Sequence, residues 1–226
     1  LGNILQGTDI QYTFVLKNQE MGKKRSSGSP DDLSTQEKIK EAARQVFTRK
    51  GYAATRTRDI AEEAGINLAL LNYYFRSKER LFHEIMLEKM QQLFGHIVPV
   101  LLTPGTTLEH KVEQLVALYM EMLTANPDLP LFVLSEIRNH PDQFASTFKV
   151  GDLLRHSDFI RQLQARRPDI HPLHFLMNLM SMTLFPFIVM PVFKAIELVD
   201  DAHFHAMMQE RKTLIPMWIE SMLKTR

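Results

Sequence analysis

Two short apolar-patterned segments joined by a four-residue turn constrain this chain more than any other part of its sequence. Thr57 is a candidate N-cap for the first segment, and Gly65 ends it. Asn67 can cap the second segment, which runs from Leu68 to Tyr74. A turn this tight usually contains glycine, because its backbone passes through a left-handed conformation. The spacing therefore predicts a helix-turn-helix.

The sequence on either side of this turn is also helical. A capping box of Ser34 and Glu37 predicts the start of a helix that Gly51 ends. Ser77 can cap a long helix that begins at Lys78 and ends near Pro99. Few windows show the alternation of a half-buried strand, so we expect an all-α fold. Apolar periodicity predicts further helices at about residues 107–125, 128–139, 142–165, 172–197 and 201–224.

Composition excludes several classes of protein. The 226 residues include no cysteine, which rules out a disulfide scaffold, a thiolate zinc site and a cysteine nucleophile. The apolar fraction of 45% and the charged fraction of 23% are ordinary for a soluble globular protein. The most apolar stretch, Leu176 to Ile196, contains two prolines and a lysine, which favours a core helix over a transmembrane span. We therefore expect a cytoplasmic protein with no membrane partner.

The net charge of +1 hides an uneven distribution along the chain. Residues 21–80 contain thirteen Lys and Arg against eight Asp and Glu, whereas residues 81–226 contain thirteen against sixteen. A basic block on a mildly acidic body suggests a polyanionic partner for the front of the chain. Chance clustering of charge is the alternative.

Residues 1–33 are predicted to be a disordered or artificially added N-terminal extension. Residues 22–33 are rich in Gly, Ser, Pro and charge, which is typical of a flexible tail. The first 20 residues lack the basic and apolar regions of a secretory signal. Our hypothesis is that Met21 is the natural start.

The second helix of the predicted helix-turn-helix has the composition of a helix that reads DNA. It carries no charge, and Leu71, Tyr74 or Phe75 are expected to pack inward. The remaining side chains would face outward, and the major groove of DNA is wide enough to admit one α-helix. A small helical bundle that binds no nucleic acid is the alternative.

The outward side chains suit contacts with bases and phosphates. Asn72 can pair bidentately with adenine, and Leu68 or Ala69 can contact a thymine methyl group. Phosphate contacts are open to Tyr73 and, from the starts of helices, to Thr57 and Lys78.

These residues carry a resemblance to a known family. Residues 56–82, RTRDIAEEAGINLALLNYYFRSKERLF, resemble the DNA-binding segment of TetR/AcrR-family transcriptional regulators. The stretch IKEAARQVFTRKGYAATRTRDIA is similar to the family's first helix and its Gly-Tyr/Phe turn. The last two-thirds of the chain agrees with the family only in length and helical character.

The resemblance implies both an architecture and a function. It implies a helix-turn-helix DNA-binding domain at residues 34–80, joined by a long helix to a ligand-binding and dimerisation domain at residues 81–226. The protein would be a homodimeric repressor or activator, with the family favouring repression, that binds a palindromic operator in double-stranded DNA. The DNA-facing positions would be Thr57, Arg58, Asn67, Leu68, Ala69, Asn72, Tyr73 and Lys78. The family often has Tyr at position 72 and His at position 74, so Asn72 is expected to change the base preference.

A dimer is expected because one recognition helix reads only a few base pairs, so half-sites would lie roughly 34 Å apart. The helices at 172–197 and 201–224 are the expected interface, although their apolar faces could instead close the monomer core. The effector would be a small hydrophobic or aromatic molecule, since Met and Phe side chains suit adaptable pockets as well as cores. The candidate effector contacts are Phe132, Met177, Met180 and Phe185.

Neither an enzyme nor a metal protein is expected. The chain lacks a P-loop, a dinucleotide-binding glycine motif and a Gly-x-Ser-x-Gly elbow. His171 and His174, like His203 and His205, lie close in sequence but complete no metal-binding motif. We therefore predict no catalytic residue, no metal and no cofactor. The alternative function is a small-molecule-sensing helical protein that acts through protein partners.

Overall fold

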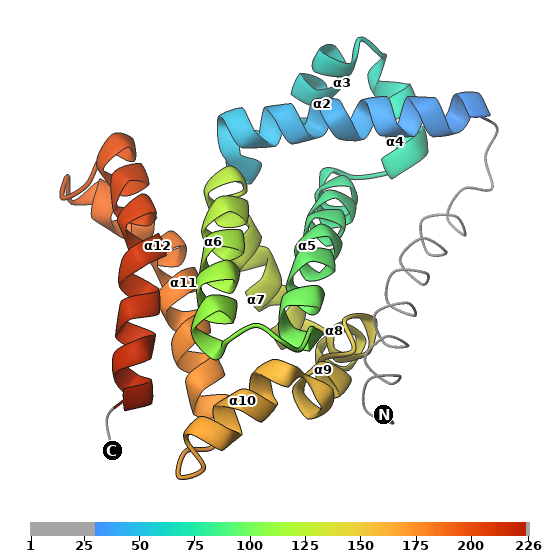
Figure 1. Ribbon diagram of the computed structural model, residues 1–226. Helices are drawn as coiled ribbons and strands as arrows, with labels where there is room; N and C mark the ends of the chain where they lie inside the picture. The colour runs from blue at the N-terminus through green and yellow to red at the C-terminus, as the bar shows by residue number, and fades with distance from the viewer. Residues whose placement is uncertain (1–29, 225–226) are drawn as a thin grey trace. The chain divides into compact units, whose positions relative to one another are not determined.

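The computed structural model describes residues 30–224, with side chains from residue 34 onward (Figure 1). The described residues form helices and contain no strand, which confirms the all-α class. They divide within helix α5 (Lys78–Leu102) into two compact units, residues 30–92 and residues 93–224. This division lies further along α5 than the domain boundary predicted between residues 80 and 81. Residues 1–29 of the predicted extension, including Met21, lie outside the described residues.

The smaller unit contains α2 (Pro30–Ala54), α3 (Thr57–Ala64), α4 (Leu68–Phe75) and the first part of α5. Helix α3 packs against both α2 and α4. The backbone of α2 breaks at Gly51, whose φ of 74° favours glycine, as the predicted helix end there required. The apolar faces of the helices meet in a core whose fully buried members include Ile39, Val46, Ile60, Leu71 and Leu81.

Two predicted helix starts were wrong in this unit. Helix α2 is already formed at Pro30, the first described residue, so Ser34 lies inside it and does not cap it. Helix α3 has Arg56 and not Thr57 as its N-cap, since the Asp59 carboxylate accepts a hydrogen bond from the Arg56 backbone N–H at 2.9 Å.

The larger unit is arranged around α6 (Leu108–Ala125), which packs against α10 (Asp158–Arg166), α11 (Pro172–Ala195) and α12 (Asp201–Lys224) (Figure 1). The remaining helices are α7 (Leu129–Asn139), α8 (Pro141–Thr147) and α9 (Val150–His156). The predicted bounds of α6, α7, α11 and α12 agree with the structure to within a few residues.

The single helix predicted over residues 142–165 was wrong, because this stretch forms α8, α9 and α10. The first break is at Lys149, whose φ of 48° lies outside the helical region. Before it, Phe148 is buried against Phe94 with the ring centroids 4.2 Å apart, and this contact turns the chain inward. The second break is at Ser157, which caps α10 by accepting a hydrogen bond from the Ile160 N–H at 3.2 Å.

Helix α11 is apolar but incompletely covered. Among the described helices it is the one long and apolar enough to cross a membrane, and 28% of its most apolar window is buried. Phe175, Leu179 and Phe187 face the core. On the opposite side, Met177, Phe185, Val192 and Ile196 are each more than half exposed and form the α11 outer face.

A buried lysine connects three helices of the larger unit. The Lys111 ammonium on α6 donates to the carbonyl oxygens of Val100 and Thr103, near the end of α5, at 2.6 and 2.5 Å. Its Nζ lies 3.6 Å from a carboxylate oxygen of Asp158 at the start of α10. Lys111 thus supplies donors to the end of α5, where backbone carbonyls have no helical partner.

The surroundings of this cluster shift the ionisation of both partners. Burial lowers the pKa of Lys111 below its ordinary value. Burial alone would raise the pKa of Asp158, but hydrogen bonds from Gln162 and Arg161 outweigh it and lower that pKa. A lowered carboxyl pKa contributes stability at neutral pH that is lost as the pH falls through the folded-state value.

Substitution Lys111→Met should lower the free energy of unfolding by about 3 kcal/mol, because it leaves buried carbonyls and a buried carboxylate without this partner. Urea unfolding measures the change. Substitution Lys224→Met removes an exposed lysine and should stay within about 0.5 kcal/mol of the unsubstituted protein. A loss of less than about 1 kcal/mol for Lys111→Met would contradict a structural role for this lysine.

Candidate nucleic-acid interface

The turn between α3 and α4 is built from backbone hydrogen bonds. Gly65 has φ 63° and ψ 37°, the left-handed conformation that the sequence predicted. Its N–H donates to the Glu62 carbonyl at 3.1 Å, and the Ile66 N–H donates to the Ala61 carbonyl at 3.0 Å. Asn67 then caps α4, because its Oδ1 accepts a hydrogen bond from the Leu70 N–H at 2.8 Å. The predicted turn and the cap at Asn67 are both confirmed.

Helix α4 has one buried face and one exposed face. Leu71 and Phe75 point into the core of the smaller unit and are almost fully buried, while Tyr74 is half-buried. The exposed residues recur at the spacing i, i+3, i+4 and i+7, which places them on one side of a helix. These residues, the α4 outer face, are Ala69, Asn72 and Tyr73 on the helix and Arg76 at its C-cap.

The α4 outer face combines groups of different chemistry. Ala69 offers a methyl group, Asn72 an amide and Tyr73 a phenol. Tyr73 is 76% exposed, and its ring meets the ring of Tyr74 edge to face with centroids 5.2 Å apart. Leu68 lies at the start of the same helix and is half-buried. The face therefore presents both apolar and hydrogen-bonding groups to whatever contacts it.

Lys78 holds the turn after α2 to the start of α5. Its ammonium donates to the carbonyl oxygens of Tyr52 and Thr55, each at 3.0 Å. The same Nζ lies 4.2 Å from the centroid of the Tyr52 ring. Tyr52 also packs against Phe82, with centroids 4.4 Å apart. Because an ammonium has three donors, these two hydrogen bonds leave Lys78 one further N–H.

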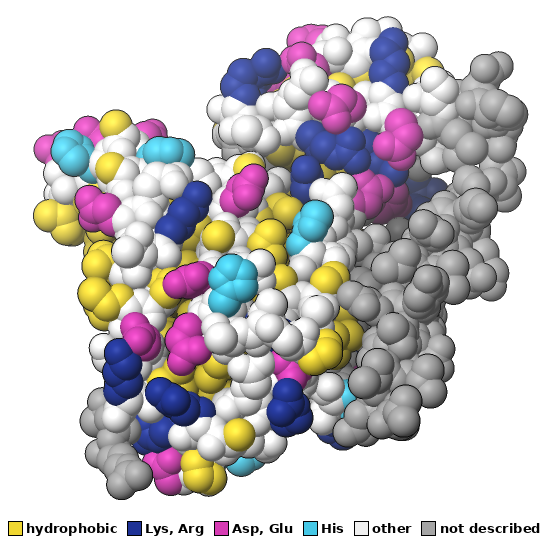
Figure 2. Space-filling model, in the orientation of Figure 1, with side chains coloured by type: hydrophobic (Ala, Val, Ile, Leu, Met, Phe, Trp, Pro, Cys, Tyr) yellow, Lys and Arg dark blue, Asp and Glu magenta, His cyan; other side chains and the backbone are white. Residues whose placement is uncertain are grey.

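Many cations of the smaller unit have a carboxylate partner. Glu88 on α5 receives Lys40 and Arg44 from α2, each at 2.7 Å, and this shared contact ties the two helices together. Basic and acidic side chains can be seen next to one another on this unit in Figure 2. Further pairs join Arg49 to Glu63, Lys50 to Asp59 and Arg80 to Glu84.

Other cations near α4 stay unpaired. Within the described residues, no ion pair is formed by Arg56 and Arg58 at the start of α3 or by Arg76 at the end of α4. All three side chains are exposed. Three of the cations that this unit does not pair internally therefore lie at the two ends of the helix-turn-helix.

Sequence reasoning missed Arg56 and Arg76 as candidate site residues. The signal for Arg76 was its spacing, since it follows Ala69 by seven positions, the repeat of one helical face. Its backbone gave no signal in the sequence: Arg76 has φ 58° and ψ −39°, a conformation that residues other than glycine rarely adopt.

The structure brings the predicted DNA-facing residues into one segment. Thr57 and Arg58 begin α3, Asn67 caps α4, and the others lie on α4 or at the start of α5. The exposed members are Arg58, Asn67, Ala69, Asn72 and Tyr73, and the half-buried members are Thr57, Leu68 and Lys78.

The predicted effector contacts are spread over different environments. Phe132 is buried on α7 and Met180 is half-buried on α11, whereas Met177 and Phe185 belong to the α11 outer face. Within the described residues, no group of three His, Asp or Glu side chains lies close enough to hold a metal ion.

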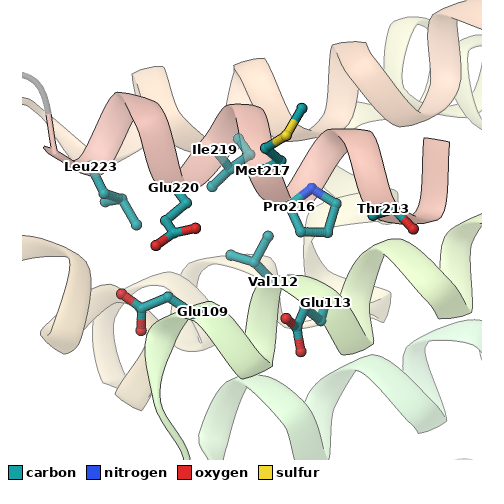
Figure 3. A pocket seen from close by; sticks show the side chains of 9 residues that line it. All are labelled: Glu109, Val112, Glu113, Thr213, Pro216, Met217, Ile219, Glu220 and Leu223. Atoms are coloured by element: carbon teal, nitrogen blue, oxygen red, sulfur yellow. The ribbon is translucent and has the colours of Figure 1, made fainter. Parts of the chain in front are cut away.

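Other residues line a groove of about 210 Å³ between α6 and α12. Figure 3 shows Val112 of α6 pointing toward α12, where Pro216 and Ile219 continue the apolar lining. Glu109 and Glu220 lie on opposite sides of the groove (Figure 3). None of the predicted effector contacts lines it, so those residues stay a prediction.

Comparison with known proteins matches the segment that contains this site. The family model described as "Bacterial regulatory proteins, tetR family" matches residues 39–85. The HTH-type transcriptional repressor KstR2 of Mycolicibacterium smegmatis is 31% identical over 120 residues, which cover 47% of this chain and 58% of that relative. The probable HTH-type transcriptional regulator YttP of Bacillus subtilis is 25% identical over 205 residues, covering 85% of this chain and 96% of that protein.

Solved structures share the fold of the chain. A putative TetR-family transcriptional regulator from Mesorhizobium loti has a TM-score of 0.55 at 20% identity, covering 86% of this chain and 98% of that one. Salmonella enterica GusR has a TM-score of 0.53 at 19% identity, covering 88% and 99%.

Substitution Arg76→Gly should raise the free energy of unfolding by up to about 1 kcal/mol. A side chain at positive φ costs roughly 1–2 kcal/mol, and glycine removes this strain. Part of the gain is offset because glycine also increases the conformational entropy of the unfolded chain. Arg58→Gly is the matched control: it lies inside α3 and should lower the same quantity by about 1 kcal/mol. Urea unfolding compares the two, and a stability loss for Arg76→Gly would contradict strain at this position.

Proposed function

The chain belongs to the TetR family of bacterial regulatory proteins, and from this premise we propose that it is a sequence-specific DNA-binding transcriptional regulator. Its relatives are named as transcriptional regulators, so it is a regulatory protein and not an enzyme. The finer proposal is a homodimeric repressor in the cytoplasm, released from its operator by a small hydrophobic molecule.

The α4 outer face is the observation that carries the DNA-binding proposal. Its exposed side chains form one stripe on a helix whose other side is anchored by Leu71 and Phe75. With this stripe in the major groove, Asn72 would pair with adenine and Ala69 would contact a thymine methyl group. Tyr73 would reach a phosphate or a base edge from the next position on the stripe.

The unpaired cations supply the electrostatic part of the proposed complex. Arg56 and Arg58 at one end of the helix-turn-helix and Arg76 at the other would contact phosphates on either side of the groove. Lys78 would share its remaining N–H with a phosphate while its other donors hold the α2 turn. Such contacts fix the orientation of α4 on DNA but carry little sequence information.

The α11 outer face supports the homodimer. Apolar residues recur along α11 at helical spacing and stay more than half exposed, including Phe185 and Val192. In Figure 2, apolar side chains are visible on the larger unit where α11 and α12 run. A second copy of the chain would cover this face, and a two-fold dimer would match a palindromic operator. A membrane is a poorer explanation, because the other side of α11 packs against α6, α7 and α12.

The third part of the proposal is a small-molecule effector that binds the larger unit. A ligand that binds one conformation of the larger unit better than another would shift the population of DNA-competent dimers. The groove between α6 and α12 offers a small hydrophobic molecule apolar contacts from Val112, Pro216 and Ile219, with glutamates at its sides. Phe132 and Met180 line the interior of the same unit and stay candidate contacts.

Base readout and phosphate contact predict different behaviour for two single substitutions. Asn72→Ala should weaken binding to the preferred sequence by about 1–3 kcal/mol and leave binding to random DNA almost unchanged. Arg58→Gln should weaken binding to both kinds of DNA and reduce the slope of log affinity against log salt by about 0.9. Fluorescence anisotropy titrations at several salt concentrations measure both. Equal losses on preferred and random DNA for Asn72→Ala would refute base readout by α4.

Substitution Phe185→Glu should raise the dimer dissociation constant roughly 100-fold, because it places a charge at the centre of an apolar interface. Sedimentation equilibrium measures the change. The control is Leu131→Glu, which alters an exposed leucine on α7 and should leave the dimer intact. A dimer that tolerates Phe185→Glu would show that another surface holds the two copies together.

A further inference from the structure

A proline inside α11 leaves one backbone carbonyl without its helical partner. In an α-helix, the N–H of each residue donates to the carbonyl four positions earlier. Pro186 has no N–H, so the carbonyl of Met182 receives no such hydrogen bond. Proline inside a helix usually kinks or weakens it unless another group satisfies the freed carbonyl.

A side chain of α12 meets this carbonyl. Arg211 Nη2 donates to the Met182 carbonyl oxygen at 2.8 Å. Arg211 and Pro186 are 25 positions apart in the sequence, on the two helices that form the last hairpin of the chain. The guanidinium therefore occupies the place where the helix itself would have supplied an N–H.

Arg211 makes few other contacts with the described residues. Its Nε is buried and has no hydrogen-bond partner, and the described residues provide no carboxylate that pairs with it. The guanidinium carbon lies 5.3 Å from the ring centroid of Trp218, one favourable contact for a cation. Burial lowers the pKa of Arg211, which reflects the cost of placing an uncompensated charge there. Since that cost is not recovered by an ion pair, the bond to Met182 is the best-defined contact that favours this placement.

The position of this bond links it to the proposed dimer. Pro186 follows Phe185, a member of the α11 outer face, and precedes the buried Phe187. A hydrogen bond between the two helices at this point would limit how far α11 can shift along α12. The arrangement of apolar side chains offered to a second copy depends on that displacement.

We propose that Arg211 is a positioning residue for the dimer surface: its guanidinium supplies the hydrogen-bond donor that Pro186 lacks and so locks the register of α11 on α12. The second half of this statement rests on the proposed homodimer. The first half concerns a single chain and can be tested whatever the oligomeric state.

A double-mutant cycle between Arg211 and Pro186 tests the first half. In Pro186→Ala, the new N–H satisfies the Met182 carbonyl, so the contribution of Arg211 should disappear. Arg211→Met should raise the unfolding equilibrium constant roughly tenfold or more in the unsubstituted chain, because a carbonyl loses a charged donor. In the Pro186→Ala background the same change should raise it less than about twofold. An equal effect in both backgrounds overturns the proposal.

The second proline of α11 provides the matched control. Pro191→Ala restores an N–H to the same helix but to the carbonyl of Phe187, which Arg211 does not contact. The effect of Arg211→Met should therefore be the same in Pro191→Ala as in the unsubstituted chain. Arg211→Lys keeps a donor and should recover part of the loss. A cycle with Pro191 that shows the same coupling as the cycle with Pro186 would contradict the specific role.

Urea unfolding at one fixed protein concentration gives the equilibrium constants, followed by far-ultraviolet circular dichroism. Trp218 is the single tryptophan of the 226 residues and adjoins Arg211, so its fluorescence reports on this contact. If Arg211→Met alone does not fold, recovery of folded protein in the Arg211→Met, Pro186→Ala double variant is the expected result. Failure of that double variant to fold, while Pro186→Ala folds, overturns the proposal.

Sedimentation equilibrium on the same variants tests the link to the dimer. Arg211→Met should raise the dimer dissociation constant at least tenfold, and adding Pro186→Ala should restore it to within about threefold. If Arg211 and Pro186 are coupled in unfolding but neither substitution changes the dimer dissociation constant, the bond stabilises the single chain only. That result would overturn its role in the interface. If the unsubstituted chain is a monomer, the proposed homodimer fails, while the unfolding cycle still decides whether Arg211 replaces the missing donor.

Discussion

The left-handed backbone at Gly65 decides what α4 can do, because it sets the direction in which the chain leaves α3. Two hydrogen bonds close the end of α3, and Asn67 begins the next helix two residues later. Leu71 and Phe75 can then reach the core that already contains Ile60, and the opposite side of α4 must face outward. Any side chain at position 65 would cost roughly 1–2 kcal/mol in this conformation. The proposed recognition surface thus depends on one backbone conformation.

In both units, some charged or apolar groups are paired or buried within the unit, and others are left exposed on its surface. In the smaller unit, Glu88 neutralises Lys40 and Arg44 between helices, whereas Arg58 and Arg76 keep their charges exposed. In the larger unit, Lys111 is enclosed among carbonyls and Asp158, while α11 leaves an apolar face uncovered. Groups with internal partners hold the fold, and groups without them are the ones that we propose contact DNA and a second copy.

Sequence patterns predicted the parts of this molecule that depend on local signals. The helix-turn-helix follows from the order of Gly65, Asn67 and the apolar positions around them, so its turn and cap were foreseeable. The breaks at Lys149 and Ser157 were not, since Phe148 turns inward because of its contact with Phe94, a long-range interaction. Pairing between distant residues is likewise invisible in a single sequence, which is why the unpaired state of Arg76 and the bond from Arg211 to α11 emerged only from the structure. Helix caps and apolar periodicity have characteristic spacings in the sequence, whereas contacts between distant residues do not.

The central claim is that α4 reads base edges as one of two symmetric copies. Selection of bound sequences from a random pool of double-stranded DNA, at low ionic strength and then at increasing salt, tests it most directly. The account predicts enrichment of a palindrome whose half-sites have a defined spacing of about one helical turn or a little more. Recovery of unenriched DNA at every salt concentration, or of a single asymmetric site, would contradict it.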